Sequence, residues 1–154
     1  MDIAKLFRSI YLFKDLSDEE LALISDITAE RDFFAGEVIF KEGDAGDAFY
    51  AVLEGKVRIS KGINGAGEEA LTILDKGSYF GEMALIDEFP RSASAVAHTD
   101  CRVLMMDKAD FSQLLSRNKD LAYKLLWVFC QVLSQRLRDT NEKIINLFAI
   151  ARGF

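Results

Sequence analysis

The chain has 154 residues and a mass of 17.3 kDa, the size of one ordinary domain, and it can bury a core without disulfides or metals. Half of its residues are hydrophobic, 29% are charged and one is proline, which excludes a disordered or low-complexity segment. Its 25 acidic and 19 basic side chains leave a net charge of −6, the wrong sign for non-specific attraction to a nucleic acid backbone. An anionic ligand must therefore be bound by local chemistry.

Cysteine and histidine are too scarce for a metal centre. Cys101 and Cys130 are the only cysteines, and His98 is the only histidine, so the two or three closely spaced ligands of a zinc or iron site are missing. We interpret His98 as a strand residue. No secretory segment opens the chain and no apolar run is long enough to span a membrane, which indicates a cytoplasmic protein without a membrane partner.

The first 28 residues read as a helical segment. Residues 17–20, Ser-Asp-Glu-Glu, form a capping box that predicts a helix ending near residue 27. Its buried face is expected to be Leu21, Leu23, Ile24 and Ile27. An apolar cluster precedes this helix and consists of Leu6, Phe7, Ile10, Leu12 and Phe13.

From residue 30 onward, short runs of Phe, Val, Ile and Tyr alternate with glycine-containing turns, which is typical of antiparallel strands and hairpins. Strands are predicted at 48–53, around Val57 and Ile59, around Leu71 and Ile73, at 94–97 and at 102–106, with turns at 35–36, 42–44, 54–55, 64–67 and 76–77. We expect about eight strands in a β-roll or jelly roll. Gly43, Gly46, Gly55 and Gly77 are interpreted as turn formers that need a positive φ.

After residue 107 the pattern becomes helical, with a short helix near 109–116 and a long one over about 119–149. Seven residues of the long helix follow heptad spacing and form what we call the seam: Leu126, Cys130, Leu133, Leu137, Thr140, Ile144 and Leu147. A second apolar face consists of Leu125, Val128, Phe129 and Val132. Because so long a helix cannot pack entirely on a small β-roll, the seam is expected to meet its own copy across a two-fold axis. The alternative is that both faces belong to one monomeric core.

Residues 77–95 carry the chemistry. The pair Gly81-Glu82 leads into a short helix-forming run, and the only proline precedes Arg91, which small residues follow. This pattern predicts one helical turn with free N–H groups and Arg91 near the start of a strand. A helix N-terminus beside an arginine favours a small anion, phosphate above all. Glu82 would repel free phosphate but would bind sugar hydroxyls, so the segment suggests a phosphate fused to a ribose.

Three spaced motifs resemble the cyclic nucleotide-binding domain family: GDAGDAFYAVLEGKV at 43–57, FGEMAL at 80–85 and PRSAS at 90–94. The lead-in at 12–21 is similar as well, so the resemblance covers about residues 6–150. It implies a single domain, 1–154, that is mainly β with flanking helices. The parts would be a helical lead-in at 1–28, a β-roll at 29–107 that includes the phosphate-binding cassette (residues 77–95), and C-terminal helices at 108–150.

The resemblance also implies roles for particular residues. Arg91 would bind the exocyclic phosphate oxygens, Glu82 the ribose 2′-OH, and the amides of Gly81, Glu82, Met83 and Ala84 the phosphate and sugar. Ser92 would complete this shell and would permit cGMP without excluding cAMP, which we favour. No catalytic or metal-binding residue is implied.

The long helix is similar to the dimer helix of regulators of the catabolite activator type. Residues 135–144 match the stretch where those regulators place polar side chains against the base, which implies contacts from Thr140 and Asn141. Thr140 also lies on the seam, where it could serve only to set the register of the helix pair. Asn141 stands where the family usually has a hydroxyl.

These features favour a non-catalytic sensor of cAMP or cGMP that moves its C-terminal helices, with an effector protein on a separate chain. Regulators of this type continue into a helix-turn-helix domain that this chain does not contain, so no direct DNA binding is expected. The alternative is a degenerate, ligand-free dimerisation or interaction module in which Glu82 and Arg91 form a structural salt bridge. An enzyme of the cupin type is disfavoured, because metal ligands and a nucleophile–base pair are both missing.

Overall fold

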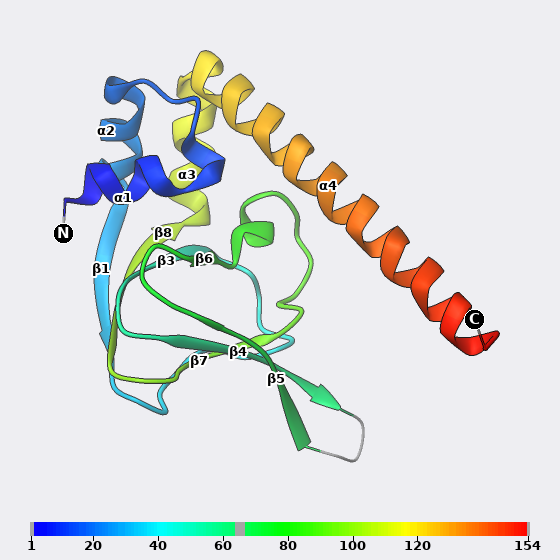
Figure 1. Cartoon of the computed structure of the whole chain (residues 1–154). Helices are drawn as coiled ribbons and strands as arrows, with labels where there is room; N and C mark the ends of the chain where they lie inside the picture. Colours follow the sequence, from blue (N-terminus) through cyan, green and yellow to red (C-terminus); the bar gives the residue numbers. More distant parts are fainter. Residues whose placement is uncertain (1, 64–66, 154) are drawn as a thin grey trace.

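Two four-stranded antiparallel sheets form the centre of the molecule in the computed structural model, which describes residues 2–63 and 67–153 (Figure 1). The strand order is β1-β8-β3-β6 in one sheet and β2-β7-β4-β5 in the other. The strands are β1 (Thr28–Phe33), β2 (Val38–Phe40), β3 (Ala48–Glu54), β4 (Val57–Ile63), β5 (Gly67–Leu74), β6 (Tyr79–Phe80), β7 (Ser94–Ala97) and β8 (Cys101–Asp107). The prediction of about eight antiparallel strands in a β-roll is confirmed.

Helices from both ends of the chain cover one end of this roll (Figure 1). They are α1 (Ile3–Ser9), η1 (Tyr11–Phe13) and α2 (Asp18–Asp26) before the strands, and α3 (Lys108–Arg117) and α4 (Lys119–Ala151) after them. The predicted capping box of α2 is present, since Ser17 and Glu20 each accept a hydrogen bond from the other's backbone N–H. Between β6 and β7 lies the one-turn helix η2 (Glu82–Leu85).

Strand β3 separates two hydrophobic cores. Its side chains alternate between the two faces of the sheet, so that Phe49, Ala51 and Leu53 pack among the helices while Ala48, Tyr50 and Val52 pack inside the roll. The helical core contains the whole predicted N-terminal cluster, whose five side chains are at most 1% exposed. The packing of β3 between the two cores therefore holds the roll interior in place next to the cassette.

Two details of the sequence-based prediction are wrong, namely the burial of Leu23 and Ile27 and the position of His98 within a strand. Leu23 and Ile27 are only half-buried, because α2 turns just Leu21 and Ile24 fully inward. The strand predicted around Leu71 and Ile73 is present as the edge strand β5, on which both side chains are exposed. His98 lies just beyond the end of β7 and is exposed. The predicted turn at 64–67 falls largely on residues 64–66, outside the described residues.

The long helix α4 uses only its first turns to pack on the body of the molecule. Leu121, Leu125, Val128 and Phe129 are buried there, while the seam residues Leu126, Leu137, Ile144 and Leu147 are 45–65% exposed. Beyond these first turns the helix runs away from the other helices (Figure 1). Within this chain, therefore, the second apolar face joins the core and the seam does not. Among the described residues, none of the helices combines the length and apolar character needed to cross a membrane.

Candidate functional site

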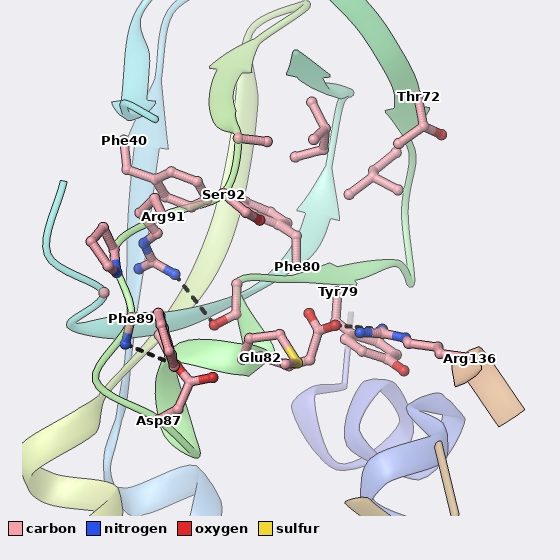
Figure 2. A pocket seen from close by; sticks show the side chains of 18 residues that line it. Phe40, Thr72, Tyr79, Phe80, Glu82, Asp87, Phe89, Arg91, Ser92 and Arg136 are labelled. Carbon is pink, nitrogen blue, oxygen red and sulfur yellow. Dashed lines mark hydrogen bonds and ion pairs between the residues drawn. The ribbon is translucent and has the colours of Figure 1, made fainter. Parts of the chain in front are cut away.

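A cavity of about 430 Å³ lies between the cassette, the second sheet and α4 (Figure 2). This volume is in the range of small-molecule sites in proteins. Six of the eight predicted site residues line it: Gly81, Glu82, Met83, Ala84, Arg91 and Ser92. Side chains from the strands complete the wall, namely Phe40, Ile59, Thr72, Leu74, Tyr79 and Phe80.

Gly81 turns the chain from β6 into η2. Its φ of +75° lies in the left-handed region, and a Cβ there would come within 2.8 Å of the Arg91 Nη1 atom and 3.2 Å of the Ala48 carbonyl oxygen. Only glycine therefore lets the arginine lie against this turn. The Ala84 N–H donates to the Gly81 carbonyl at 3.2 Å, so this one of the four predicted amide donors is already engaged.

Gly46 does not act as a turn former with positive φ, contrary to the prediction, whereas Gly43, Gly55 and Gly77 do. The reason for a glycine at position 46 is close approach. A Cβ there would lie 2.9 Å from the Ala84 Cβ, closer than van der Waals contact allows. The absence of a side chain lets the loop before β3 touch η2.

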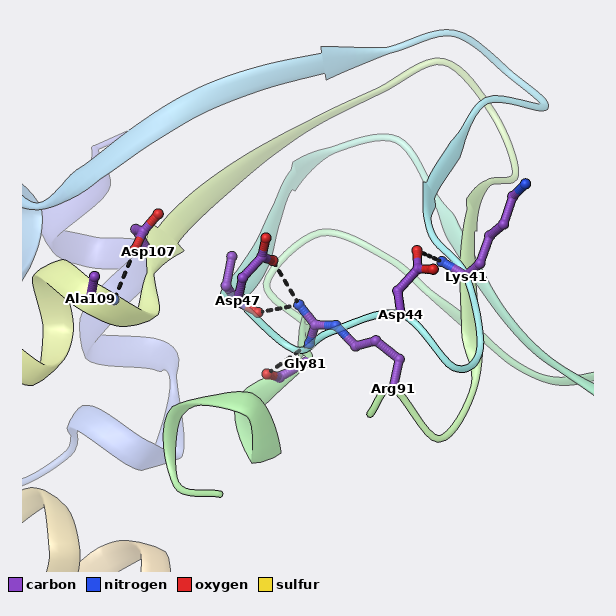
Figure 3. A network of polar contacts seen from close by, with 8 residues as sticks. Lys41, Asp44, Asp47, Gly81, Arg91, Asp107 and Ala109 are labelled. Atoms are coloured by element: carbon purple, nitrogen blue, oxygen red, sulfur yellow. Dashed lines mark hydrogen bonds and ion pairs between the residues drawn. The ribbon is translucent and has the colours of Figure 1, made fainter. Parts of the chain in front are cut away.

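Arg91 lies beside the loop that precedes β3 (Figure 3), and backbone hydrogen bonds join the two. Its N–H donates to the Asp44 carbonyl at 2.8 Å, and its carbonyl accepts from the Gly43 N–H at 2.8 Å. One residue further, the Ser92 carbonyl accepts from the Lys61 Nζ atom of β4 at 3.0 Å. These bonds hold Arg91 just ahead of β7, where the sequence predicts it.

The Arg91 guanidinium is buried and only partly satisfied. Nη2 donates to the Ala48 carbonyl at 2.7 Å and Nη1 to the Gly81 carbonyl at 3.3 Å, while the Phe40 ring stacks beneath at 4.1 Å. The nearest carboxylate, that of Asp47, is 3.7 Å away and 82% exposed. Nε is buried and has no hydrogen-bond partner.

Burial lowers the pKa of Arg91, and the charges of Tyr50 and Asp47 oppose this effect. Neutral carbonyl oxygens satisfy two of its donors without neutralising the charge. A buried cation with an unpaired donor, on a residue that lines a cavity, is suited to binding an anion.

Glu82 is buried on the opposite wall of the cavity and pairs with Arg136 of α4 (Figure 2). Arg91 and Glu82 do not pair with each other among the described residues, so the structural salt bridge between them is not formed. Arg136 is a site residue that the sequence analysis missed. Its signal was present, because it lies one turn before Thr140 on nearly the same helix face.

Thr140 and Asn141 do not line the cavity formed by this chain, and both are exposed. They lie four and five residues beyond Arg136, about 6 Å or more further along α4. Thr72 of β5, by contrast, does line the cavity. The alternation of β5 could have revealed it, since Thr72 and Leu74 share the face opposite Leu71 and Ile73.

The chemistry of the site is that of hydrogen bonding and charge. In the part of the chain that the structure describes, no group of three or more His, Cys, Asp or Glu side chains is placed to hold a metal ion. The cavity offers a buried cation, a buried carboxylate and an apolar wall.

The sequence profile of the family described as "Cyclic nucleotide-binding domain" matches residues 30–118. The chain belongs to the cyclic nucleotide-binding domain family. The match spans the whole roll from within β1 through β8 and includes the cassette.

Proteins similar to this chain include a transcriptional regulator and regulatory subunits of cAMP-dependent protein kinase. It is 38% identical over 133 residues to the cyclic AMP receptor protein of Thermus thermophilus, covering 86% of this chain and 60% of the relative. Its structure resembles the N-terminal domain of a transcriptional regulator from Streptomyces coelicolor A3(2), with a TM-score of 0.78 and 31% identity over 90% of this chain and 94% of that one. It also resembles the regulatory domain of Toxoplasma gondii PKA, crystallised with cAMP, with a TM-score of 0.69 and 27% identity over 73% of this chain and 42% of that one. The chain spans about 60% of the length of the curated relatives it matches first.

Proposed function

We propose that this cyclic nucleotide-binding domain is a sensor that binds a cyclic nucleotide, with cAMP favoured over cGMP, and passes the binding event to its C-terminal helices. The observation that carries the proposal is the buried guanidinium of Arg91, a residue that lines the cavity and whose Nε atom has no hydrogen-bond partner. A buried unsatisfied donor costs about 1–3 kcal/mol, and a cyclic phosphate would relieve that cost while neutralising the charge. The Toxoplasma gondii regulatory domain, which shares the fold, was crystallised with cAMP.

The ribose would lie between η2 and α4. The Glu82 carboxylate is an acceptor for the 2′-OH, and its Arg136 partner holds it in place from α4. A hydroxyl donating to a carboxylate contributes about 1.5 to 3 kcal/mol. The sugar would therefore touch the Glu82–Arg136 ion pair, which joins the cassette to α4.

The base would lie along the apolar wall formed by Ile59, Leu74 and neighbouring side chains. Thr72 and Ser92 would offer hydroxyls to its polar edge, since both line the cavity. Thr140 and Asn141 would reach the base only if α4 packs more closely on the roll or a second copy presents them. We infer no catalytic step, and the nucleotide would leave the site unchanged.

The output would act through α4. Its exposed seam supports a homodimer formed by this helix, and a separate effector chain would respond to the change in the pair. We place this protein in the cytoplasm, because its two cysteines are unpaired and thiols stay reduced in that compartment. The alternative function is a ligand-free dimerisation module, in which Arg91 would only brace the Ala48 and Gly81 carbonyls.

The deciding experiment is isothermal titration of cAMP, and then cGMP, into protein shown by ultraviolet absorbance to be free of nucleotide. Arg91→Ala should lower affinity by roughly a hundred- to several-thousand-fold, because about 3–5 kcal/mol is lost when a buried phosphate has no partner. Arg102→Ala is the matched control, since Arg102 pairs with Asp32 on the surface. No heat from either nucleotide with folded wild-type protein would favour the ligand-free module.

A further inference from the structure

Lys108, the first residue of α3, is hydrogen-bonded both to the cassette loop after η2 and to the residue just before β3. It follows β8 directly, and the preceding residue, Asp107, caps the helix by accepting from the Ala109 N–H at 2.8 Å. Figure 3 shows Asp107 and Ala109 beside Asp47, at the start of β3. The helix therefore begins at the edge of the site.

On the cassette side, the Lys108 Nζ atom donates to the Asp87 carbonyl at 2.6 Å and to the Glu88 carboxylate at 3.0 Å. The Lys108 side chain is 20% exposed and that of Glu88 is 94% exposed. An ion pair so open to water contributes little, so the sheltered bond to the Asp87 carbonyl is the one that restrains the loop.

On the strand side, the Lys108 N–H donates to the Asp47 carbonyl at 2.8 Å. The Asp47 carboxylate lies 3.7 Å from Nη2 of Arg91, and the next carbonyl, that of Ala48, accepts from the same nitrogen. Lys108 thus joins the start of β3, which holds the Arg91 side chain, to the cassette loop at Asp87.

Only α3 itself and a one-residue junction separate Lys108 from α4. Helix α3 ends at Arg117, and Asn118 alone precedes the first residue of α4. The Asn118 N–H and side-chain amide both donate to the Leu114 carbonyl, at 3.1 and 3.0 Å. A shift at the start of α3 is therefore carried to the start of α4.

We propose that Lys108 is the positioning residue that sets the cassette against β3 and transmits cassette movement through α3 to α4. The transmission depends on the proposed function, because a ligand must move the cassette. We call the Lys108 hydrogen bonds to the Asp87 and Asp47 carbonyls the tether, and the tether holds the cassette with or without ligand.

The tether is tested by hydrogen exchange on the ligand-free protein. Lys108→Met keeps the side-chain stem and the backbone bond but removes the Nζ donor, so amides at 82–88 should exchange about tenfold faster, a change of about 1.4 kcal/mol. Lys108→Arg should restore protection. Lys124→Met is the matched control, because Lys124 makes a bond of the same length to Glu20, away from the cassette. Lys108→Gln is a second variant if Lys108→Met does not fold.

Transmission is read from the only tryptophan, Trp127, which lies on α4. Saturating cAMP should change its fluorescence in the wild type, Lys108→Arg and Lys124→Met, and the change should be at least halved in Lys108→Met. Unchanged exchange at 82–88 would overturn the tether, and a full Trp127 response in Lys108→Met would overturn the transmission. If titration shows that the wild type binds neither cAMP nor cGMP, the proposed function fails and transmission with it, while the exchange data still decide the tether.

Discussion

Arg91 carries a charge that the fold buries without giving it a buried anion. Its contacts are two carbonyl oxygens, an aromatic ring and a carboxylate that stays in solvent. Such an arrangement is costly in an empty site and is compensated when a phosphate enters. The glycines at positions 46 and 81 also shape this site, because each allows a close approach where a methyl group would collide.

The proposed role of Glu82 can be tested directly, because its proposed partner is a single hydroxyl, the ribose 2′-OH. Glu82→Gln should lower cAMP affinity about tenfold, because a neutral acceptor bonds the 2′-OH less strongly than a carboxylate does. Binding of 2′-deoxy-cAMP should barely change. Titration of both nucleotides into both proteins checks this, and an equal loss for the deoxy ligand would refute the assignment of Glu82 to the ribose.

At the scale of elements, α2 and α4 are joined by the bond between Lys124 and Glu20, 2.6 Å long. Burial raises the pKa of Glu20, but the bonds from Lys124 and Ser17 outweigh it and hold this pKa below its ordinary value of about 4.3. The ion pair therefore stabilises the fold fully above that value, and the contribution is lost as pH falls through the lower folded-state pKa.

Glu20→Gln should accordingly reduce the free energy of unfolding at pH 7 by up to about 1 kcal/mol, while the glutamine still serves the capping box. At pH 3 the difference from the wild type should shrink toward zero. Urea unfolding at both pH values measures it. Glu19→Gln removes the same charge from the same turn without touching Lys124, so an equal loss in that variant would show that the ion pair is not responsible.

An element could be predicted from the sequence where neighbouring residues alone specify it, and not where residues far apart in the chain must meet. The capping box at Ser17 and the apolar run of the strand at 48–53 are local signals, and both elements are present as expected. Arg136 meets Glu82 across 54 positions of sequence, and no local pattern specifies that contact. The exposure of Leu71 and Ile73 on β5 was not predicted either, because an edge strand can expose apolar residues that a central strand must bury.

The whole molecule has an unpartnered surface along α4. This helix has 33 residues and is about 50 Å long, and its seam is exposed beyond the turns that pack on the core. Exposed apolar residues at heptad spacing are stabilised when a second helix covers them. We therefore expect the chain to form a two-fold dimer whose axis runs along the seam.

Cys130 offers a direct measurement of that dimer, because it is exposed and lies on the seam. Across a parallel two-fold pair, seam residues face their own copies at a distance that a disulfide can span. Mild oxidation should therefore link two chains, whereas Cys101 stays free because it is buried and burial raises its pKa. Leu137→Glu should abolish the cross-link and raise the dimer dissociation constant at least tenfold in sedimentation experiments, since it sets two charges against each other on the axis. Gln131→Glu adds the same charge off the seam and should do neither, so comparable dissociation in that variant, or no cross-link in the wild type, would refute the seam as the interface.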